Sequence, residues 1–324
     1  MKIVLTGSLG NISRPLAKDL VQKGHSVVVI SSKAERQKEI EAMGAKAAIG
    51  TMQDIGFLAT TFTDADIVYL METGGPANMF NKSYDLNEAT REIVNCYKKA
   101  VEQSGIKKLV HLSSIGAHTD KGVGLLKLHH IAENILKQLP DDVSIKFMRP
   151  VGFYTNLLVN IEIIKTLSKG FIGGIMALQH YGIAGLLSGK RGVIVANYGS
   201  DVMNLLVSPY DIASVISEEM EKPFEGRTIR YIASEELTCN EVAKILGEAI
   251  GKPYLKWGTI SDKMLTNTML KRGMNEMMVK GIVEMGASGR IGKLYEDYYK
   301  HRPVLGKTKL KDYAVEFAKE YNKK

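Results

Sequence analysis

The first twenty residues constrain the fold of this chain more than any other stretch. An apolar, β-branched run from Lys2 to Leu5 leads into a glycine-containing turn at residues 6–13, and apolar residues recur at helical spacing from Pro15 to Val21. A helix that begins directly after such a turn presents free N–H groups and a positive dipole end. Because glycine lets the backbone approach a pyrophosphate closely, this stretch predicts a dinucleotide site.

The turn departs from the usual glycine series at one position. Ser13 stands where a G-x-x-G-x-x-G series has its third glycine, and we interpret this small residue as a tolerated variant. The residues predicted to line the pyrophosphate are Gly7, Ser8, Leu9, Gly10, Asn11 and Ile12. A strand, turn and helix without any ligand is the alternative interpretation.

Strand-like and helix-like segments alternate through the first half of the chain. Apolar runs typical of buried strands span residues 26–30, 45–49, 66–70, 108–112 and 144–148. Between these runs, residues 34–43, 85–104 and 129–138 are expected to form helices. This alternation predicts right-handed crossovers and a parallel sheet with helices on both faces. The predicted fold class is therefore α/β, with a doubly wound parallel sheet.

After Pro150 the alternation fades, which indicates a smaller, mostly helical C-terminal lobe. We expect a helix from Phe153 to Gly170, followed by an irregular, glycine-rich apolar stretch from Phe171 to Lys190. This stretch should belong to the core or line a pocket, and it is too short to span a bilayer. Thr238, with Glu241 three residues later, predicts a capping box. The predicted first domain comprises residues 1–154 with a return at about residues 202–236, and the lobe comprises residues 155–201 and 237–324.

The charge distribution and the cysteine content indicate which partners and which compartment to expect. Lys and Arg exceed Asp and Glu by 43 to 35, but the excess is spread thinly and its densest run, residues 300–311, is interrupted by Pro303 and Gly306, so we expect no nucleic-acid partner. Two cysteines without a spaced framework indicate a reducing compartment and no metal site. Because the first predicted strand begins at Lys2, we expect a cytoplasmic protein. We also expect no membrane contact, and either a monomer or a homodimer.

The end of the second strand indicates which dinucleotide is bound. An acidic residue there would accept the ribose hydroxyls of NAD, whereas this chain has Ser31, Ser32 and Lys33, with Arg36 one turn later. Hydroxyl donors and cations suit the additional phosphate of NADP. We therefore predict NADP rather than NAD. The alternative is that Lys33 and Arg36 only solvate a helix end.

The later strand ends supply further candidates. Met71, Glu72 and Thr73 should cover the middle of the cofactor, where Glu72 faces either the ribose or solvent. Ser113, at the end of the fifth strand, is a candidate catalytic residue that donates to a substrate carbonyl. The alternative is that its hydroxyl only satisfies backbone groups at the strand end.

In these motifs the sequence resembles the NmrA-like family of the atypical short-chain dehydrogenases. The resemblance covers nearly the whole chain and rests on Thr6 to Ile12, Lys108 to Ser114, His129-x-x-x-Glu133, Arg149 to Phe153 with Asn156, Val207 to Ala213, and Leu237-Thr238. It implies a Rossmann-like domain that binds NADP or NAD, with Pro150 and Phe153 beside the cofactor, and a lobe that closes over the nicotinamide. Members of this family are either reductases of quinones and similar acceptors or redox-sensing regulators.

The Tyr-x-x-x-Lys pair of the wider superfamily is missing. Counting back from Glu133 places His129 at the lysine position and Leu125 at the tyrosine position. His129 is a candidate to bind the nicotinamide ribose or to deliver a proton. A helix histidine bonded into the structure is the alternative.

Two functions from different classes remain open. The first is an NADPH-dependent reductase of a small apolar acceptor, whose pocket the apolar residues Phe153, Leu157, Phe171, Ile172, Met176 and Tyr181 would line. The second is a non-catalytic NADP-sensing protein that binds a regulated protein partner. The first does not need the tyrosine, because a quinone can draw its protons from water.

Overall fold

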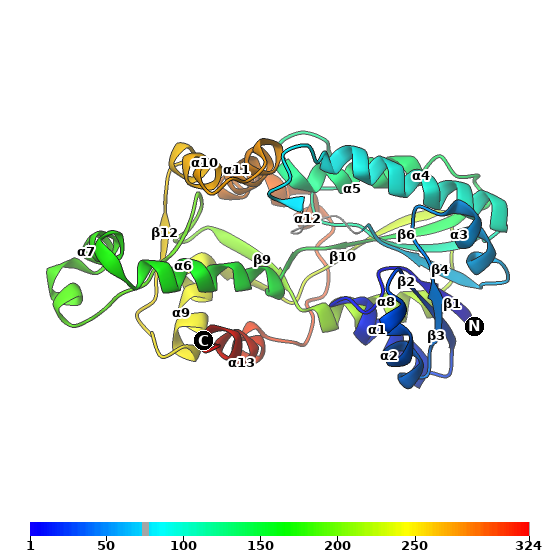
Figure 1. Cartoon of the computed structure of the whole chain (residues 1–324), viewed down its shortest axis with the longest axis horizontal. Coiled ribbons are helices and arrows are strands. Elements are labelled where there is room, and N and C mark those ends of the chain that lie inside the picture. Colours follow the sequence, from blue (N-terminus) through cyan, green and yellow to red (C-terminus); the bar gives the residue numbers. More distant parts are fainter. Residues whose placement is uncertain (73–77, 324) are drawn as a thin grey trace.

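The computed structural model describes residues 1–72 and 78–323. Its centre is a seven-stranded sheet in the order β10-β6-β5-β4-β1-β2-β3 (Figure 1). The strands are β1 (Lys2–Leu5), β2 (Ser26–Ser31), β3 (Lys46–Ile49), β4 (Ile67–Leu70), β5 (Lys108–Leu112), β6 (Ser144–Pro150) and β10 (Arg227–Ile232). Every neighbouring pair is parallel. The predicted doubly wound α/β fold is confirmed.

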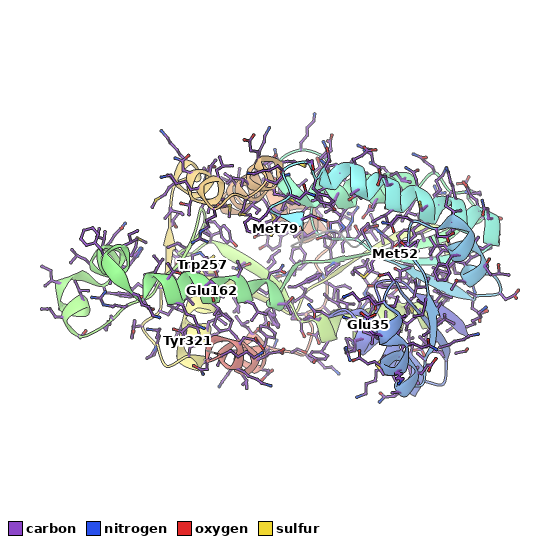
Figure 2. The ribbon with its side chains drawn as sticks, viewed as in Figure 1. Glu35, Met52, Met79, Glu162, Trp257 and Tyr321 are labelled. Atoms are coloured by element: carbon purple, nitrogen blue, oxygen red, sulfur yellow. The ribbon has the colours of Figure 1, made fainter. Side chains whose placement is uncertain are left out.

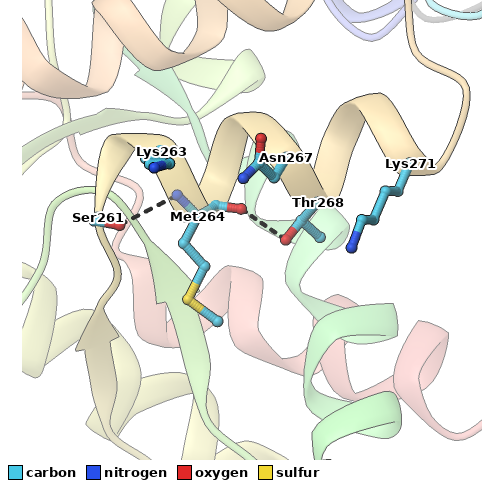
Figure 3. Close-up of a pocket in the computed structure, with 6 residues that line it drawn as sticks. All are labelled: Ser261, Lys263, Met264, Asn267, Thr268 and Lys271. Atoms are coloured by element: carbon cyan, nitrogen blue, oxygen red, sulfur yellow. Dashed lines mark hydrogen bonds between the residues drawn. The ribbon is translucent and has the colours of Figure 1, made fainter.

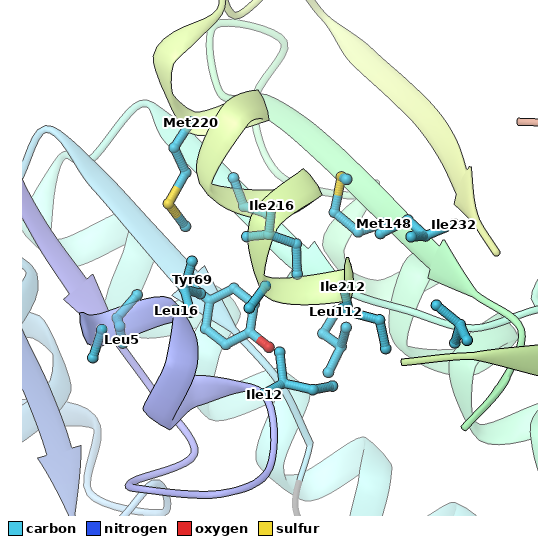
Figure 4. Close-up of a cluster of buried hydrophobic side chains, with 14 of the residues drawn as sticks. Leu5, Ile12, Leu16, Tyr69, Leu112, Met148, Ile212, Ile216, Met220 and Ile232 are labelled. Carbon is cyan, nitrogen blue, oxygen red and sulfur yellow. The ribbon is translucent and has the colours of Figure 1, made fainter. Parts of the chain in front are cut away.

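Helices cover both faces of this sheet. One face carries α1 (Ser13–Gln22), α2 (Gln37–Ala42) and α8 (Pro209–Glu221), and the other carries α3 (Ile55–Phe62), α4 (Leu86–Ser104) and α5 (Lys127–Leu136). Because the strands are buried on both sides, alternate residues of each strand enter two separate cores. Figure 4 shows the first core, where Leu16 of α1 and Ile212 of α8 lie around Tyr69 of β4.

The order of the strands reverses beside β1. This strand pairs with β2 on one side and with β4 on the other, so the crossovers leave in opposite directions. The loops after β1 and β4 therefore separate and leave a crevice for a ligand at the carboxyl edge. The last strand, β10, and the helix α8 before it reach this sheet from a distant part of the sequence and pack on β6 and α1.

The second lobe contains two small sheets and most of the remaining helices. Its strands are β7 (Gly152–Phe153), β8 (Ile194–Ala196), β9 (Met203–Val207), β11 (Glu235–Thr238) and β12 (Trp257–Thr259). Its helices are α6 (Asn160–Leu167), α7 (Gly170–Leu187), α9 (Cys239–Ala249), α10 (Asp262–Lys271), α11 (Glu276–Arg290), α12 (Glu296–Lys300) and α13 (Leu310–Tyr321). Figure 2 labels Trp257 and Tyr321 in this lobe; Trp257 is buried and donates to the Tyr198 carbonyl at 2.9 Å.

Helix caps account for several of the element boundaries. The predicted capping box is confirmed: Thr238 Oγ1 accepts from the Glu241 N–H, and Glu241 Oε2 accepts from the Thr238 N–H. Asp54 caps α3, a helix that the sequence analysis did not identify. That cap was the available signal, because the β-branched and small residues of α3 give it little helical pattern.

Two predictions about residues 153–190 are wrong. The segment expected to be one helix from Phe153 consists of β7, a 3₁₀ helix at Tyr154–Val159 and then α6. The stretch expected to be irregular and internal is the helix α7, of which only 22% is buried. Within the described residues α7 alone is long and apolar enough to cross a membrane by length and composition.

Candidate cofactor site

The glycine turn after β1 is attached to the end of β2. The Ser8 N–H donates to the Ile30 carbonyl at 3.1 Å, and Ser8 Oγ donates to Ser31 Oγ at 2.9 Å. Gly7 has a φ of +86°, and a Cβ there would lie 2.2 Å from Met71 Sδ. Only glycine therefore fits at position 7, and this close packing fixes the turn against the start of the loop that follows β4.

The first turn of α1 is open to an anion. Ile12 is the N-cap residue and gives no side-chain cap, and no acidic residue lies in the first turn. Among the described residues, nothing accepts the N–H groups of Leu9, Asn11 or Ile12. Ser13, in place of the third glycine, is buried and donates to the Thr6 carbonyl at 3.2 Å. The turn thus presents free donors at a helix N-terminus without a protein acceptor.

The residues after β2 separate into a buried and an exposed set. Ser31 is buried against the glycine turn, whereas Ser32 and Lys33 are exposed and Arg36 is half-buried. Neither Lys33 nor Arg36 forms an ion pair with any residue in the described part of the chain. Two cations with no acidic partner beside the turn suit a phosphate monoester.

Glu72 points inward and meets two histidines. Its Oε1 lies 2.7 Å from Nε2 of His111, a fully buried residue of β5, and its Oε2 lies 4.0 Å from Nδ1 of His129 on α5. Burial alone would raise the pKa of Glu72, but His111 outweighs it and lowers that pKa. The expectation that Glu72 faces solvent is excluded by its side chain, which is 5% exposed. Glu72 Oε2 and His129 Nδ1 are buried and have no hydrogen-bond partner among the described residues.

His129 is uncharged at neutral pH. Burial lowers its pKa to about 4, and the nearby Glu72 carboxylate reverses only part of this change. A neutral imidazole can donate and accept one hydrogen bond each, but it is a poor proton donor to a substrate. Of its two predicted roles, positioning a ribose hydroxyl therefore fits this ring, and delivering a proton at neutral pH does not.

Ser113 is part of a buried ionic cluster. Its hydroxyl donates to Glu133 Oε1 at 2.7 Å, and Arg149 donates to both oxygens of Glu133, from Nε at 2.8 Å and from Nη2 at 2.7 Å. Arg149 Nη1 also reaches Asp297 of α12 at 3.2 Å. The Ser113 hydroxyl therefore donates to a side-chain carboxylate, and not to the backbone groups at the strand end that the alternative named, and in this geometry its proton is not available to a substrate carbonyl. No local pattern in the sequence indicates the Glu133–Arg149 pair, because its members are 16 residues apart.

Leu125, at the position of the missing tyrosine, is in contact with the second lobe. Leu125 packs against Gly281 of α11, where a Cβ would lie 2.5 Å from Leu125 Cδ2. Pro150 is the buried end of β6, and Phe153 of β7 is half-buried against the first core. Thr73, which was also predicted to cover the cofactor, lies outside the described residues.

The six apolar residues expected to line one substrate pocket do not lie together. Leu157 belongs to the core of the second lobe, while Phe171 and Ile172 of α7 are 83% and 68% exposed. Two pockets of the described chain lie elsewhere in that lobe. One, of about 400 Å³, lies along α10 between Ser261 and Lys271 (Figure 3), and the other, of about 590 Å³, lies beside β12 at Trp257. Neither of these two pockets is lined by any of the six residues, so the common pocket stays a prediction.

Comparison with known proteins supports binding of an NAD(P) dinucleotide. Residues 7–155 match the model of a family described as NAD(P)H-binding. The fold is similar to triphenylmethane reductase of Citrobacter sp., with a TM-score of 0.71 and 18% identity over 98% of this chain and 99% of that one.

Two further solved structures have the same fold. A nucleoside-diphosphate-sugar epimerase of Staphylococcus aureus has a TM-score of 0.71 and 13% identity over 97% of this chain and 100% of that one. An NADPH-dependent quinone oxidoreductase of Escherichia coli, solved with NADPH, has a TM-score of 0.69 and 18% identity over 97% of this chain and 99% of that one. At these identities the likeness shows the fold, and with the family match it supports NAD(P) binding.

Proposed function

We propose that this protein is an NADPH-dependent reductase that transfers hydride to a small apolar acceptor such as a quinone, an enone or an aldehyde. The observation that carries the proposal is the uncapped N-terminus of α1 behind the glycine turn, at the point where the strand order reverses. The similarity to a dye reductase and to a quinone oxidoreductase supports hydride transfer as the chemistry.

The described residues fit the three polar parts of NADPH. The free N–H groups at Leu9, Asn11 and Ile12 would bind the pyrophosphate, and Lys33 with Arg36 would bind the 2′-phosphate. The unpartnered atoms Glu72 Oε2 and His129 Nδ1 would share one hydroxyl of the nicotinamide ribose. When bound, the reduced nicotinamide supplies the hydride.

A quinone acceptor suits a site without the tyrosine. Leu125 fills the tyrosine position and His129 is neutral, so the chain offers no acid of near-neutral pKa at these two positions. A reduced quinone can take its protons from water, whereas reduction of an aldehyde gains more from a positioned acid. We therefore rank quinones above aldehydes among the acceptors.

The direct test is turnover. We expect stopped-flow loss of NADPH absorbance with quinones. The kcat/KM should be constant between about pH 6 and about pH 8, because His129, at the lysine position, does not titrate in that range. A panel of quinones, enones and aldehydes should be compared with protein-free reactions. Failure of every acceptor to exceed that background would contradict the reductase.

The cofactor preference is tested by removing the two cations after β2. Lys33→Gln with Arg36→Gln should weaken NADPH binding about tenfold or more, since each exposed charge-assisted contact contributes of the order of 1 kcal/mol, and should leave NADH binding unchanged. Lys38→Gln, an exposed residue of α2, is the control. Equal losses for NADPH and NADH in isothermal titration calorimetry would show that these cations do not read the 2′-phosphate.

A second function is favoured by the surroundings of Leu125 and Ser113. Leu125 fills the tyrosine position and packs against α11, and the candidate catalytic residue Ser113 donates to Glu133, so neither is free to act on a substrate. This arrangement suits a protein that binds NADP and signals its redox state to a partner. Tight NADPH binding without turnover, together with a partner captured differently in NADP and in NADPH, would establish that function in place of the reductase.

A further inference from the structure

The helix α7 carries an apolar surface that no described part of the chain covers. We call residues 170–192, which comprise α7 and the segment that returns to β8, the α7 hairpin. Its large apolar side chains at least 46% exposed are Phe171, Ile172, Ile175, Leu178, Ile183 and Leu187. Figure 1 shows α7 at the end of the molecule farthest from the large sheet. An apolar patch of this kind on a soluble protein marks a site of interaction.

The hairpin cannot cross a bilayer as one straight helix. Gly182 has a φ of +68° and breaks the helix, and the hydroxyl of Tyr181, directly before the break, donates to the Gly192 carbonyl at 2.7 Å. Lys256 Nζ donates to the His180 carbonyl at 3.1 Å, so the middle of the hairpin is fixed to the residue that directly precedes β12. Both ends return to the same lobe, through α6 and β8. A hairpin held in this way lies on a surface rather than through it.

Basic residues flank the α7 hairpin at both of its ends. No acidic residue occurs between Glu162 and Asp201. The cations of the hairpin, of α6 and the residues between α6 and the hairpin, and of the segment before β12 that bonds to hairpin carbonyls are Lys165, Lys169, Lys190, Arg191, Lys252 and Lys256, which we call the basic rim. None of these six forms an ion pair with an acidic residue in the parts of the chain that the structure describes. Exposed phenylalanine, isoleucine and leucine within a rim of unpaired lysine and arginine match an anionic lipid surface.

The charge argues against a second copy of this chain as the occupant. In a two-fold symmetric contact the same patch from each copy would meet, which would bring two cationic rims together. That repulsion has no acidic counterpart within the hairpin. An anionic bilayer, in contrast, gains from both the apolar and the cationic residues.

We propose that the α7 hairpin docks the protein onto anionic phospholipid bilayers, with Phe171, Ile172, Ile183 and Leu187 in the interface and the basic rim among the lipid phosphates. This inference replaces the expectation of no membrane contact, and it is independent of the reductase proposal. It concerns peripheral binding of the whole chain.

The first test removes the apolar anchor. Full-length protein should sediment with vesicles of phosphatidylcholine and phosphatidylglycerol, and Phe171→Ser with Ile172→Ser should lower its partition coefficient about tenfold or more, because both side chains would leave the interface. Since both residues are exposed, these changes should not alter the fold. Val304→Ser with Val315→Ser, at exposed valines outside the hairpin, is the matched control.

The second test removes the charge. Lys169→Glu with Lys190→Glu should abolish the preference for phosphatidylglycerol over phosphatidylcholine alone, whereas Lys307→Glu with Lys311→Glu, which changes the net charge equally, should preserve it. Absence of sedimentation with anionic vesicles, or an equal loss in the control pair, would overturn the proposal. A dimer seen in analytical ultracentrifugation that the serine pair dissociates, without lipid binding, would identify a second copy as the occupant instead.

Discussion

Gly10→Glu should abolish NADPH binding. The new side chain would extend from the turn into the path of the pyrophosphate, and its carboxylate would add a negative charge at the helix N-terminus that has to attract phosphates. We expect at least a hundredfold weaker affinity in isothermal titration calorimetry, which corresponds to about 2.7 kcal/mol or more. Both proposed functions depend on this result, because each requires a bound dinucleotide.

The fold should survive this change, so the experiment separates binding from stability. Gly10 is exposed, and a Cβ there would approach only the Gly7 carbonyl oxygen, at 3.4 Å. The thermal unfolding midpoint should therefore stay close to that of the parent chain. Gly174→Glu, which makes the same charge change on α7, is the control and should bind NADPH normally. If Gly10→Glu binds NADPH as the parent does, the glycine turn is not the pyrophosphate site.

Arg149→Met should destabilise the chain by about 3–5 kcal/mol, the cost typical of leaving one member of a buried ion pair without its partner. Arg149 is 3% exposed and Glu133 is fully buried. Burial alone would raise the pKa of Glu133, but Arg149 outweighs it and lowers that pKa. Without the guanidinium the carboxylate loses two hydrogen bonds and its buried counter-charge, and it keeps only the Ser113 hydroxyl and the more exposed Lys137 as partners. Urea unfolding at neutral pH measures the loss.

The deficit should shrink as the pH falls. The carboxylate of Glu133 in Arg149→Met would be protonated more readily than in the parent chain, and protonation removes a buried charge that has lost its arginine partner. Lys107→Met is the control, since it breaks an exposed pair with Asp142 and should cost at most about 1 kcal/mol. A loss for Arg149→Met no larger than that of Lys107→Met would show that the buried cluster contributes little.

The sequence predicted the parts of the fold that depend on local pattern. Buried parallel strands are continuous apolar runs, so the strands of the first domain were identified from residues such as Lys108 to Leu112. The Thr238–Glu241 capping box was predicted for the same reason, because both partners lie within one helical turn. The α/β class followed from the alternation of such elements.

Features that depend on distant contacts could not be predicted. Ser113 and Glu133 are 20 residues apart in the sequence, and the hydrogen bond between them exists only because α5 packs across the end of β5. Glu72 meets His111 for the same reason, since β4 and β5 are neighbours in the sheet. The exposure of α7 was missed because an apolar helix has the same composition whether it is internal or external.

The origin of β10 has a consequence for biosynthesis. This strand completes the large sheet beside β6, yet about eighty residues that build much of the second lobe are translated between the two strands. A nascent chain that has emerged only as far as β6 would expose that strand as an unpaired edge, which is prone to association with other chains. The large sheet therefore cannot be completed until the chain has been translated past Ile232. A truncation before that residue would leave the sheet without a complete β10.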